Sequence, residues 1–505
     1  MNWIVVNVQL HERRVAILED GKLVELLLER SDQRRIVGNI YKGVVENIVP
    51  GLQAAFVEIG LPKRAFLHVS DISRFNPFSD SETEEGNEEF VQPTLKRNGT
   101  LIQNILKRGQ EILVQIVRDP IGTKGPRCTT QLTLAGRYIV LIPGAKHIGI
   151  SRRINDRAER ARLRRAISAL KPRDCGVIVR TIAKGRSAEV LKQDLEQLMA
   201  AWEKVKQRAI AMPPGSLIYR DAGMIPALIR DQFSPDIEKF IIDSKDEYIK
   251  VVKYVKQVAP ELVDRIELYK GKEPIFDHYG IEPQIDAMMK REVRLPSGGQ
   301  IVIDQTEALV AIDVNTGKFV GKKHYEDTLL KVNLEAAEEI ARQLRLRDLG
   351  GLIVIDFIDM ESPENISKVE KAFKLAMKRD RAHKKILPMN EFCMLILTRE
   401  RVQQSIISRL TEICPTCEGV GRIYSPSTMV ANIERWLMRA KGKVRRKLLI
   451  LVHPLVAEEL LSNGRLNDFK DQYGFSLTVF ADETVEPNKY RIFDAESGDE
   501  VTETV

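Results

Sequence analysis

Two apolar runs that each end in an aspartate constrain the fold of this chain most strongly. The first extends from Ala308 to Asp313 and continues to Asn315, and the second extends from Gly350 to Asp356. Each run is short, rich in Ile and Val and closed by a turn signal, which predicts a buried strand. When two such strands are neighbours, their carboxylates meet at one edge and form an oxygen site of the kind that Mg²⁺ favours.

An aspartate at the end of a strand is more often a turn residue or a helix N-cap than a catalyst. The repetition of the design, with Asn315 two positions after Asp313, strengthens the functional interpretation. Alternation along a strand places residues i and i+2 on one face, so Asp313 and Asn315 address the same site. Asp313, Asn315 and Asp356 are therefore the candidates for metal-assisted chemistry.

Length and composition set the class of protein. A chain of 505 residues is too long for a single core, so two to four domains are expected. With 43% hydrophobic and 30% charged residues, and without an apolar run of membrane-spanning length or a signal peptide, a soluble protein is expected. Five cysteines are few and odd in number, which favours a reducing cytoplasm over a disulfide framework.

The net charge of +7 is unevenly spread. The segment 151–173 is dense in Arg and Lys, which suits a polyanion such as RNA. The other interpretation is a solvated helix face, because Asp156 and Glu159 are interspersed. In contrast, Asp80 to Glu89 is acidic and poor in apolar residues, and a disordered loop between two strands is expected there.

Residues 36–130 show several short strands separated by Gly and Pro turns, the pattern of a small barrel. The sequence from Gly43 to Val57, followed by Ala65 to Asp71, resembles the S1 RNA-binding domain. Barrels of this type hold single strands by stacking bases on exposed aromatic rings within a basic groove. Without the resemblance, the two phenylalanines are better explained as core residues. The candidate RNA-binding residues are Phe56, Phe66, His68 and Lys124.

The resemblance extends over nearly the whole chain. Residues 291–309, 312–321 and 333–360 are its most specific stretches, and with them the chain resembles the RNase E/G endoribonucleases. The sequence stops at Val505 without the long disordered tail of many family members, so the short members of the family are the expected relatives.

This resemblance implies an enzyme that hydrolyses single-stranded, A/U-rich RNA with Mg²⁺ and leaves 5′-phosphate and 3′-hydroxyl ends. Asp313 and Asp356 would bind the Mg²⁺, with Asn315 assisting, while Asp359 would have a supporting role. The family acts in rRNA maturation and mRNA decay and prefers RNA with a 5′-monophosphate. The residues implied for 5′-phosphate sensing are Gly136, Val140, Arg152, Arg153, Arg180 and Thr181.

Cys414 and Cys417 form a Cys-x-x-Cys pair followed by glycines. Structural zinc takes four tetrahedral ligands, and the sequence has no second pair of this kind, so two subunits would have to complete the site. A redox-active pair and two free thiols are the alternatives. The resemblance implies one Zn²⁺ shared across a homodimer, with dimers associating further into a homotetramer.

The expected fold class is multidomain α/β, and the resemblance also implies the division of the chain. The expected parts are an RNase H-like subdomain from residues 1–35 and 222–288, the S1 barrel at 36–130, the 5′-sensor at 131–221, a DNase I-like catalytic domain at 289–410, a zinc-link at 411–424 and a small C-terminal oligomerisation domain at 425–505. The RNase H-like part is expected to be structural.

Two other functions are compatible with parts of the sequence. One is a non-catalytic S1-type RNA-binding factor in ribosome or RNA assembly. Such a protein would have no use for two aspartates, because without a metal they repel the phosphates of RNA. The other is a redox protein based on Cys414 and Cys417, which explains neither the basic segment nor the barrel.

Overall fold

A computed structural model describes residues 1–30, 35–72, 101–120, 124–317, 325–401 and 404–504. The chain divides into two compact units, Met1–Ile407 and Ser408–Val505, and the short helix α9 (Ile406–Leu410) crosses their boundary. The acidic run from Asp80 to Glu89, expected to be a disordered loop, lies outside the described residues. None of the helices in the described ranges combines the length and apolarity needed to cross a membrane.

The first sheet of unit 1 joins the N-terminus to a distant part of the chain, in the order β15-β14-β1-β2-β3. Its strands are β1 (Asn2–Val8), β2 (Glu12–Glu19), β3 (Lys22–Arg30), β14 (Lys239–Ile242) and β15 (Ile266–Leu268). Asp20 and Gly21, both at positive φ, make the tight hairpin that the sequence predicted between β2 and β3. The helices of this part are α3 (Met224–Gln232), α4 (Lys245–Val258), α5 (Ile275–His278) and α6 (Glu282–Met288).

The next part of unit 1 is a closed barrel. Its strands are β4 (Ile40–Val49), β5 (Ala54–Glu58), β6 (Ala65–His68), β7 (Glu111–Arg118) and β8 (Arg127–Thr129). The ring closes because β4 pairs with both β5 and β7, while β8 pairs with both β6 and β7. A further strand, β13 (Leu217–Tyr219), pairs with β4 from outside the ring.

A four-stranded sheet of order β11-β12-β10-β9 follows the barrel. It consists of β9 (Leu134–Ala135), β10 (Ile139–Pro143), β11 (Ile148–Ile150) and β12 (Cys175–Val179), with α1 (Arg157–Leu170) and α2 (Ala188–Ala211) packed against it. The Asp156 carboxylate accepts hydrogen bonds from the Ala158 and Glu159 N–H groups, so α1 starts where the basic segment was expected to be helical.

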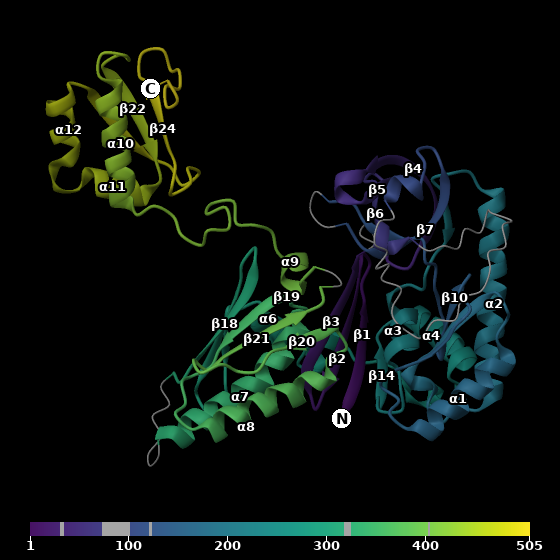
Figure 1. Ribbon diagram of the computed structural model, residues 1–505. Coiled ribbons are helices and arrows are strands. Elements are labelled where there is room, and N and C mark those ends of the chain that lie inside the picture. Colours follow the sequence, from purple (N-terminus) through teal and green to yellow (C-terminus); the bar gives the residue numbers. More distant parts are fainter. Residues whose placement is uncertain (31–34, 73–100, 121–123, 318–324, 402–403, 505) are drawn as a thin grey trace. The chain divides into compact units, whose positions relative to one another are not determined.

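The largest open sheet of unit 1 has the order β16-β17-β18-β19-β21-β20. Its strands are β16 (Glu292–Arg294), β17 (Gln300–Gln305), β18 (Leu309–Asn315), β19 (Gly351–Asp356), β20 (Lys384–Ile386) and β21 (Met394–Arg399). The helices α7 (Tyr325–Leu346) and α8 (Pro363–Ala376) lie together along this sheet (Figure 1).

The expectation of fully buried strands is wrong for β18 and β19. Their side chains alternate, with Ile312 and Ile355 in the core and Asp313 and Asp356 on the open face. Leu352, in the same run, is 41% exposed. One face of the sheet is therefore available to a ligand.

Unit 2 contains the sheet β23-β22-β24. Its elements are α10 (Pro426–Ala440), β22 (Lys447–Val452), α11 (Pro454–Leu461), α12 (Arg465–Tyr473), β23 (Ser476–Ala481) and β24 (Tyr490–Asp494). The helix predicted after Lys447–His453 is present, and His453 leaves the strand because its side chain caps α11 by accepting the Leu455 N–H. Trp436 is buried in the core of this unit.

Candidate active site

The two aspartates identified in the sequence occupy paired positions in the largest open sheet. Strands β18 and β19 are parallel neighbours, and their register places Asp313 directly opposite Asp356. Adjacent strands lie about 4.8 Å apart, and both side chains are exposed on the same face. The fold therefore brings together two carboxylates that are 43 residues apart in the sequence.

Asn315 belongs to the same group of side chains. Its Nδ2 donates a hydrogen bond of 2.7 Å to Oδ2 of Asp313, two positions back along β18. The amide adds a donor and an acceptor to the site without adding charge. This contact agrees with the expectation that Asp313 and Asn315 belong to one site.

The electrostatics of the pair favour a bound cation. Burial raises the pKa of Asp356, and the charges of Asp313 and Asp359 raise it further. Within the described ranges, neither Asp313 nor Asp356 forms an ion pair with a basic side chain. Two neighbouring carboxylates without an ion-pair partner are the donor set that a hard divalent cation neutralises.

The number of ligands fits Mg²⁺ better than a cation held entirely by protein. Among the described residues, no group of three or more His, Cys, Asp and Glu side chains is placed to hold a metal. Mg²⁺ keeps several waters and is commonly bound through one or two carboxylates together with substrate phosphates. Asp313 and Asp356 satisfy that requirement, so the residues present fit the predicted metal.

The residues predicted to sense a 5′-phosphate cluster at the end of β12. Arg180 donates from Nη1 to the Gly136 carbonyl at 2.9 Å, and its Nη2 lies 2.6 Å from Oδ1 of Asp231. The strand ends at Val179, and Thr181 begins a 3-10 turn. Arg180 and Thr181 therefore lie just beyond the end of the strand, where Arg180 is half-buried and Thr181 is exposed.

The exposed part of this cluster is basic and hydroxylic. The Thr181 hydroxyl lies 2.7 Å from the Ser151 hydroxyl, and Arg152 and Arg153 follow Ser151 with exposed side chains. Nη2 of Arg153 also donates to the Arg381 carbonyl at 3.4 Å.

Val140 is half-buried within β10, where its register pairs it with Ala135 and Ile178. The structure therefore brings Gly136, Arg180, Thr181 and Arg153 close to one another, with Val140 in the supporting sheet.

Two aromatic rings lie next to each other on the barrel. Phe56 on β5 is paired with Phe66 on β6, and their ring centroids are 5.9 Å apart in an edge-on arrangement. Both are half-buried, as is His68, which shares the face of Phe66 and lies 2.8 Å through Nδ1 from the Ser70 hydroxyl. Lys124 is exposed. The rings are therefore not enclosed core residues.

The two cysteines of unit 2 are accessible to solvent. Cys414 is exposed and Cys417 is partly so, whereas the other three cysteines are buried. Hydrogen bonds from the backbone N–H groups of Cys417 and Thr416 lower the pKa of the Cys414 thiol, which favours the thiolate that binds metal. The Gly421 N–H donates to Sγ of Cys417 at 3.3 Å.

Comparisons with known proteins agree with this geometry. Residues 133–402 match the Ribonuclease E/G family, and residues 35–92 match the S1 RNA binding domain. Ribonuclease G of Haemophilus influenzae is 39% identical over 460 residues, which cover 91% of this chain and 92% of that protein. Ribonuclease G of Escherichia coli strain K12 is 38% identical over 458 residues, which cover 90% of this chain and 92% of that protein.

The longer relatives match through part of their length. Ribonuclease E of Haemophilus influenzae is 38% identical over 509 residues, which cover 100% of this chain and 53% of that protein. The chain belongs to the ribonuclease E/G family. The expected resemblance, the likeness to ribonuclease G and the assignment as an endoribonuclease are thereby confirmed.

The S1 match confirms the RNA-binding barrel, and the mixed α/β multidomain fold is confirmed at that level. The finer division into named subdomains stays a prediction, as do the roles of the individual site residues.

Some residues that shape the site of this family member were missed from the sequence. The Asp194 carboxylate accepts the N–H groups of Arg137, Tyr138 and Ile139, and a Cβ at Gly136 would lie 2.6 Å from it. This contact fixes the turn that offers the Gly136 carbonyl to Arg180.

Ser151, Asp231 and Asn333 were also missed. The side chain of Asn333 is fully buried on α7 and bonds both the carbonyl and the N–H of Ile358, so it holds the backbone that follows Asp356. A polar residue inside the apolar stripe of α7 was the one signal that the sequence offered for this contact.

Proposed function

We propose that this member of the ribonuclease E/G family is a Mg²⁺-dependent endoribonuclease that cleaves single-stranded, A/U-rich RNA to 5′-phosphate and 3′-hydroxyl ends. The observation that carries the proposal is the direct pairing of Asp313 with Asp356 on parallel strands, with Asn315 bonded to Asp313. A protein that only binds RNA gains nothing from two aspartates that repel the phosphates of its ligand.

Asp313 and Asp356 are the residues that would hold the metal. Mg²⁺ held by these carboxylates would supply Lewis-acid stabilisation of the phosphate charge and would activate water as a nucleophile near neutral pH. Asn315 fixes the Asp313 carboxylate through the 2.7 Å hydrogen bond and offers an uncharged donor to the phosphate. Asp359 adds negative charge that keeps the pKa of Asp356 raised, and it has a supporting role.

The barrel is proposed to hold the RNA strand by stacking. The half-buried rings of Phe56 and Phe66 present a paired aromatic surface, with His68 on the same face. Stacking on aromatic rings tolerates any base, which suits an enzyme for single strands of varied sequence. Lys124 supplies a positive charge for the backbone.

The cluster after β12 is proposed to recognise a 5′-monophosphate and so to favour monophosphorylated substrates. The Arg180 guanidinium and the Thr181 hydroxyl are the direct donors, with Arg152 and Arg153 around them. Arginine is well matched to phosphate because its planar donors bind two oxygens at once. Gly136 and Val140 would shape the wall of this site.

The assembly proposed for this protein is a homodimer joined by Zn²⁺ shared between Cys414 and Cys417 of each chain, with dimers pairing into a homotetramer. The exposed pair, with the lowered pKa of Cys414, supplies two of the four ligands that structural zinc requires. A cytoplasmic location and roles in rRNA maturation and mRNA decay complete the proposal, and the family resemblance supports them.

A cleavage assay tests the proposal. A short A/U-rich single-stranded RNA with either a 5′-monophosphate or a 5′-hydroxyl is incubated with wild type and with Asp356→Asn, over a range of Mg²⁺ concentrations. Cleavage by wild type, its loss in the variant and unchanged RNA binding are expected. If wild type binds the RNA but never cuts it with Mg²⁺ or Mn²⁺, the non-catalytic RNA-binding factor is the better explanation.

A further inference from the structure

The arginine at the centre of the 5′-sensor has a carboxylate partner that no part of the proposed function uses. We propose that Asp231 determines 5′-end specificity by competing with the 5′-phosphate for the Arg180 guanidinium. This inference rests on the proposed 5′-sensor. It assigns to Asp231 the task of weakening the binding of 5′ groups in proportion to their negative charge.

The first step is the geometry of Arg180. Its Nη2 lies 2.6 Å from Oδ1 of Asp231, and its Nη1 donates to the Gly136 carbonyl at 2.9 Å. The Arg180 side chain is 25% exposed and that of Asp231 is 35% exposed, so solvent reaches both groups. A phosphate that approaches the free N–H groups of Arg180 must therefore enter the field of the Asp231 carboxylate.

The second step is that Asp231 stays ionised. Burial alone would raise the pKa of Asp231, but hydrogen bonds and charge from Arg230, and then from Arg180, outweigh it and lower the pKa. Arg230 contacts both oxygens of Asp231, with Nε 3.1 Å from Oδ1 and Nη2 3.3 Å from Oδ2. One carboxylate thus serves two arginines.

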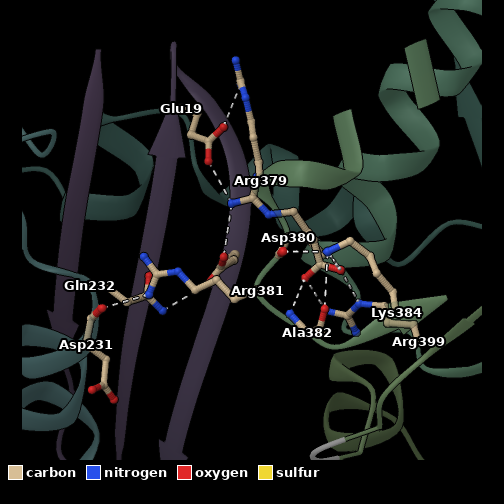
Figure 2. Close-up of polar contacts among 11 residues, drawn as sticks. Glu19, Asp231, Gln232, Arg379, Asp380, Arg381, Ala382, Lys384 and Arg399 are labelled. Atoms are coloured by element: carbon tan, nitrogen blue, oxygen red, sulfur yellow. Dashed lines mark hydrogen bonds and ion pairs between the residues drawn. The ribbon is translucent and has the colours of Figure 1, made fainter. Parts of the chain in front are cut away.

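The third step is that Asp231 is held in place. Nη1 of Arg381 donates to the Asp231 carbonyl at 3.1 Å (Figure 2). The adjacent Gln232 donates to Glu25 at 3.3 Å. Arg381 precedes β20 of the largest open sheet. The backbone of Asp231 is therefore held by a segment outside the β11-β12-β10-β9 sheet, after which Arg180 lies. The Arg381 contact anchors the backbone of Asp231 and Arg230 contacts both of its carboxylate oxygens, so the carboxylate is held beside Arg180.

The consequence depends on the charge of the RNA end. A 5′-hydroxyl is neutral and is not repelled by Asp231. A monophosphate carries a charge of about −1.5 to −2, and a triphosphate carries a larger negative charge. Repulsion scales with the product of the charges, so Asp231 penalises a triphosphate more than a monophosphate. The site therefore discriminates between phosphorylated ends by charge.

The test compares Asp231→Asn with a matched control, Asp221→Asn. Asp221 pairs with Arg230 at 3.0 Å as Asp231 does, and no contact with Arg180 is recorded for it, so the control removes a carboxylate from the same arginine only. Binding of 2′-O-methyl RNA, which is not cleaved, is measured by fluorescence anisotropy with 5′-hydroxyl, 5′-monophosphate and 5′-triphosphate ends. Thermal melting reports the folding of each variant.

Asp231→Asn is expected to tighten binding of the monophosphorylated RNA about three- to ten-fold, to tighten the triphosphorylated RNA more, and to leave the 5′-hydroxyl RNA unchanged. Asp221→Asn is expected to behave as wild type. Unchanged or weaker binding of both phosphorylated RNAs by Asp231→Asn overturns the inference. Asp231→Glu keeps the charge and should discriminate between the RNA ends as wild type does. If Asp231→Glu tightens binding of the phosphorylated RNAs as much as Asp231→Asn does, the inference is also overturned.

Arg180→Gln separates the two levels of the argument. If this variant keeps the preference for 5′-monophosphate, the proposed sensor itself is wrong. If Arg180→Gln loses the preference while Asp231→Asn behaves as Asp221→Asn, the sensor stands and only the competition by Asp231 fails.

Discussion

Asp313 faces Asp356 across two parallel strands because β18 and β19 pair in the register that places these two residues opposite each other. A shift of that register by one residue would turn one of the carboxylates into the core, since alternate side chains of a strand point to opposite faces. The buried residues Ile312 and Ile355, which precede the two aspartates, help to secure the register because they belong to the hydrophobic core that residues of α7 and α8 share.

Replacement of Asn315 tests how the pair is supported. Asn315→Ala removes the 2.7 Å donor to Asp313 and is expected to lower kcat about 10- to 100-fold, as is typical when a hydrogen bond to a metal-binding carboxylate is lost, while KM stays near the wild-type value. Asn315→Asp introduces a third negative charge and should be more damaging. Single-turnover cleavage of a 5′-hydroxyl RNA measures the effect, and an alanine variant with wild-type kcat would contradict it.

The paired phenylalanines of the barrel should act on binding and leave the chemical step alone. Phe56→Ala and Phe66→Ala are each expected to weaken RNA binding by about 1–3 kcal/mol, the value of one stacked base, and to raise KM with little change in kcat. Phe56→Tyr keeps the ring and serves as the control. Anisotropy titrations with single-stranded RNA and thermal melts separate loss of stacking from loss of folding.

Local signals in the sequence were sufficient for the elements that carry the chemistry. The runs ending in Asp313 and Asp356 are strands, the hairpin at Asp20 and Gly21 forms, and the Cys414 pair lies in an exposed loop. Each of these follows from neighbouring residues, through apolar pattern, turn preference or spacing.

Contacts between distant segments were not predictable from local patterns. Arg180 meets Asp231 across 51 residues, and Arg153 meets Arg381 across 228 residues. The open face of β18 and β19 was also missed, because a continuous apolar run looks the same whether one or both faces are covered. The tertiary arrangement of strands and segments determines both these contacts and the open face. Patterns among neighbouring residues of one sequence do not reveal that arrangement.

A buried ion pair joins β21 to the segment that precedes β20, the edge strand of the largest open sheet. Arg399 on β21 bonds Asp380 through Nε at 2.9 Å and through Nη2 at 3.2 Å, and the two side chains are 6% and 3% exposed (Figure 2). Asp380→Asn leaves the buried Arg399 with Asp348, 2.8 Å from Nη1, as its remaining carboxylate partner among the described residues, and is expected to cost about 1.5–3 kcal/mol of unfolding free energy, the value of a hydrogen bond to a charged group. The exposed pair of Arg491 and Glu500 provides the control, since Glu500→Gln should change the unfolding free energy far less.

The same pair predicts a dependence of stability on pH. Burial alone would raise the pKa of Asp380, but the hydrogen bonds and charge of Arg399 outweigh it and lower the pKa. A carboxylate with a lowered folded-state pKa contributes stability above its unfolded value of about 3.9 and loses it as the pH falls further. The difference in unfolding free energy between wild type and Asp380→Asn should be constant near neutral pH and shrink below about pH 4. Denaturant titrations at several pH values measure it, and a difference that grows on acidification would contradict the assignment.

The cysteine pair predicts a fixed ratio of zinc to protein. Each chain offers Cys414 and Cys417, and a tetrahedral site needs four ligands, so one Zn²⁺ per two chains is expected by elemental analysis and native mass spectrometry. Cys414→Ser and Cys417→Ser should each abolish zinc binding and release monomers. Cys175→Ala, at a buried cysteine, is the control and should keep both zinc and dimer. A chelator should have the effect of the serine variants on wild type, because the metal supplies the link between subunits. One zinc per chain, or dimers that persist after the metal is removed, would show that the pair does not join two subunits.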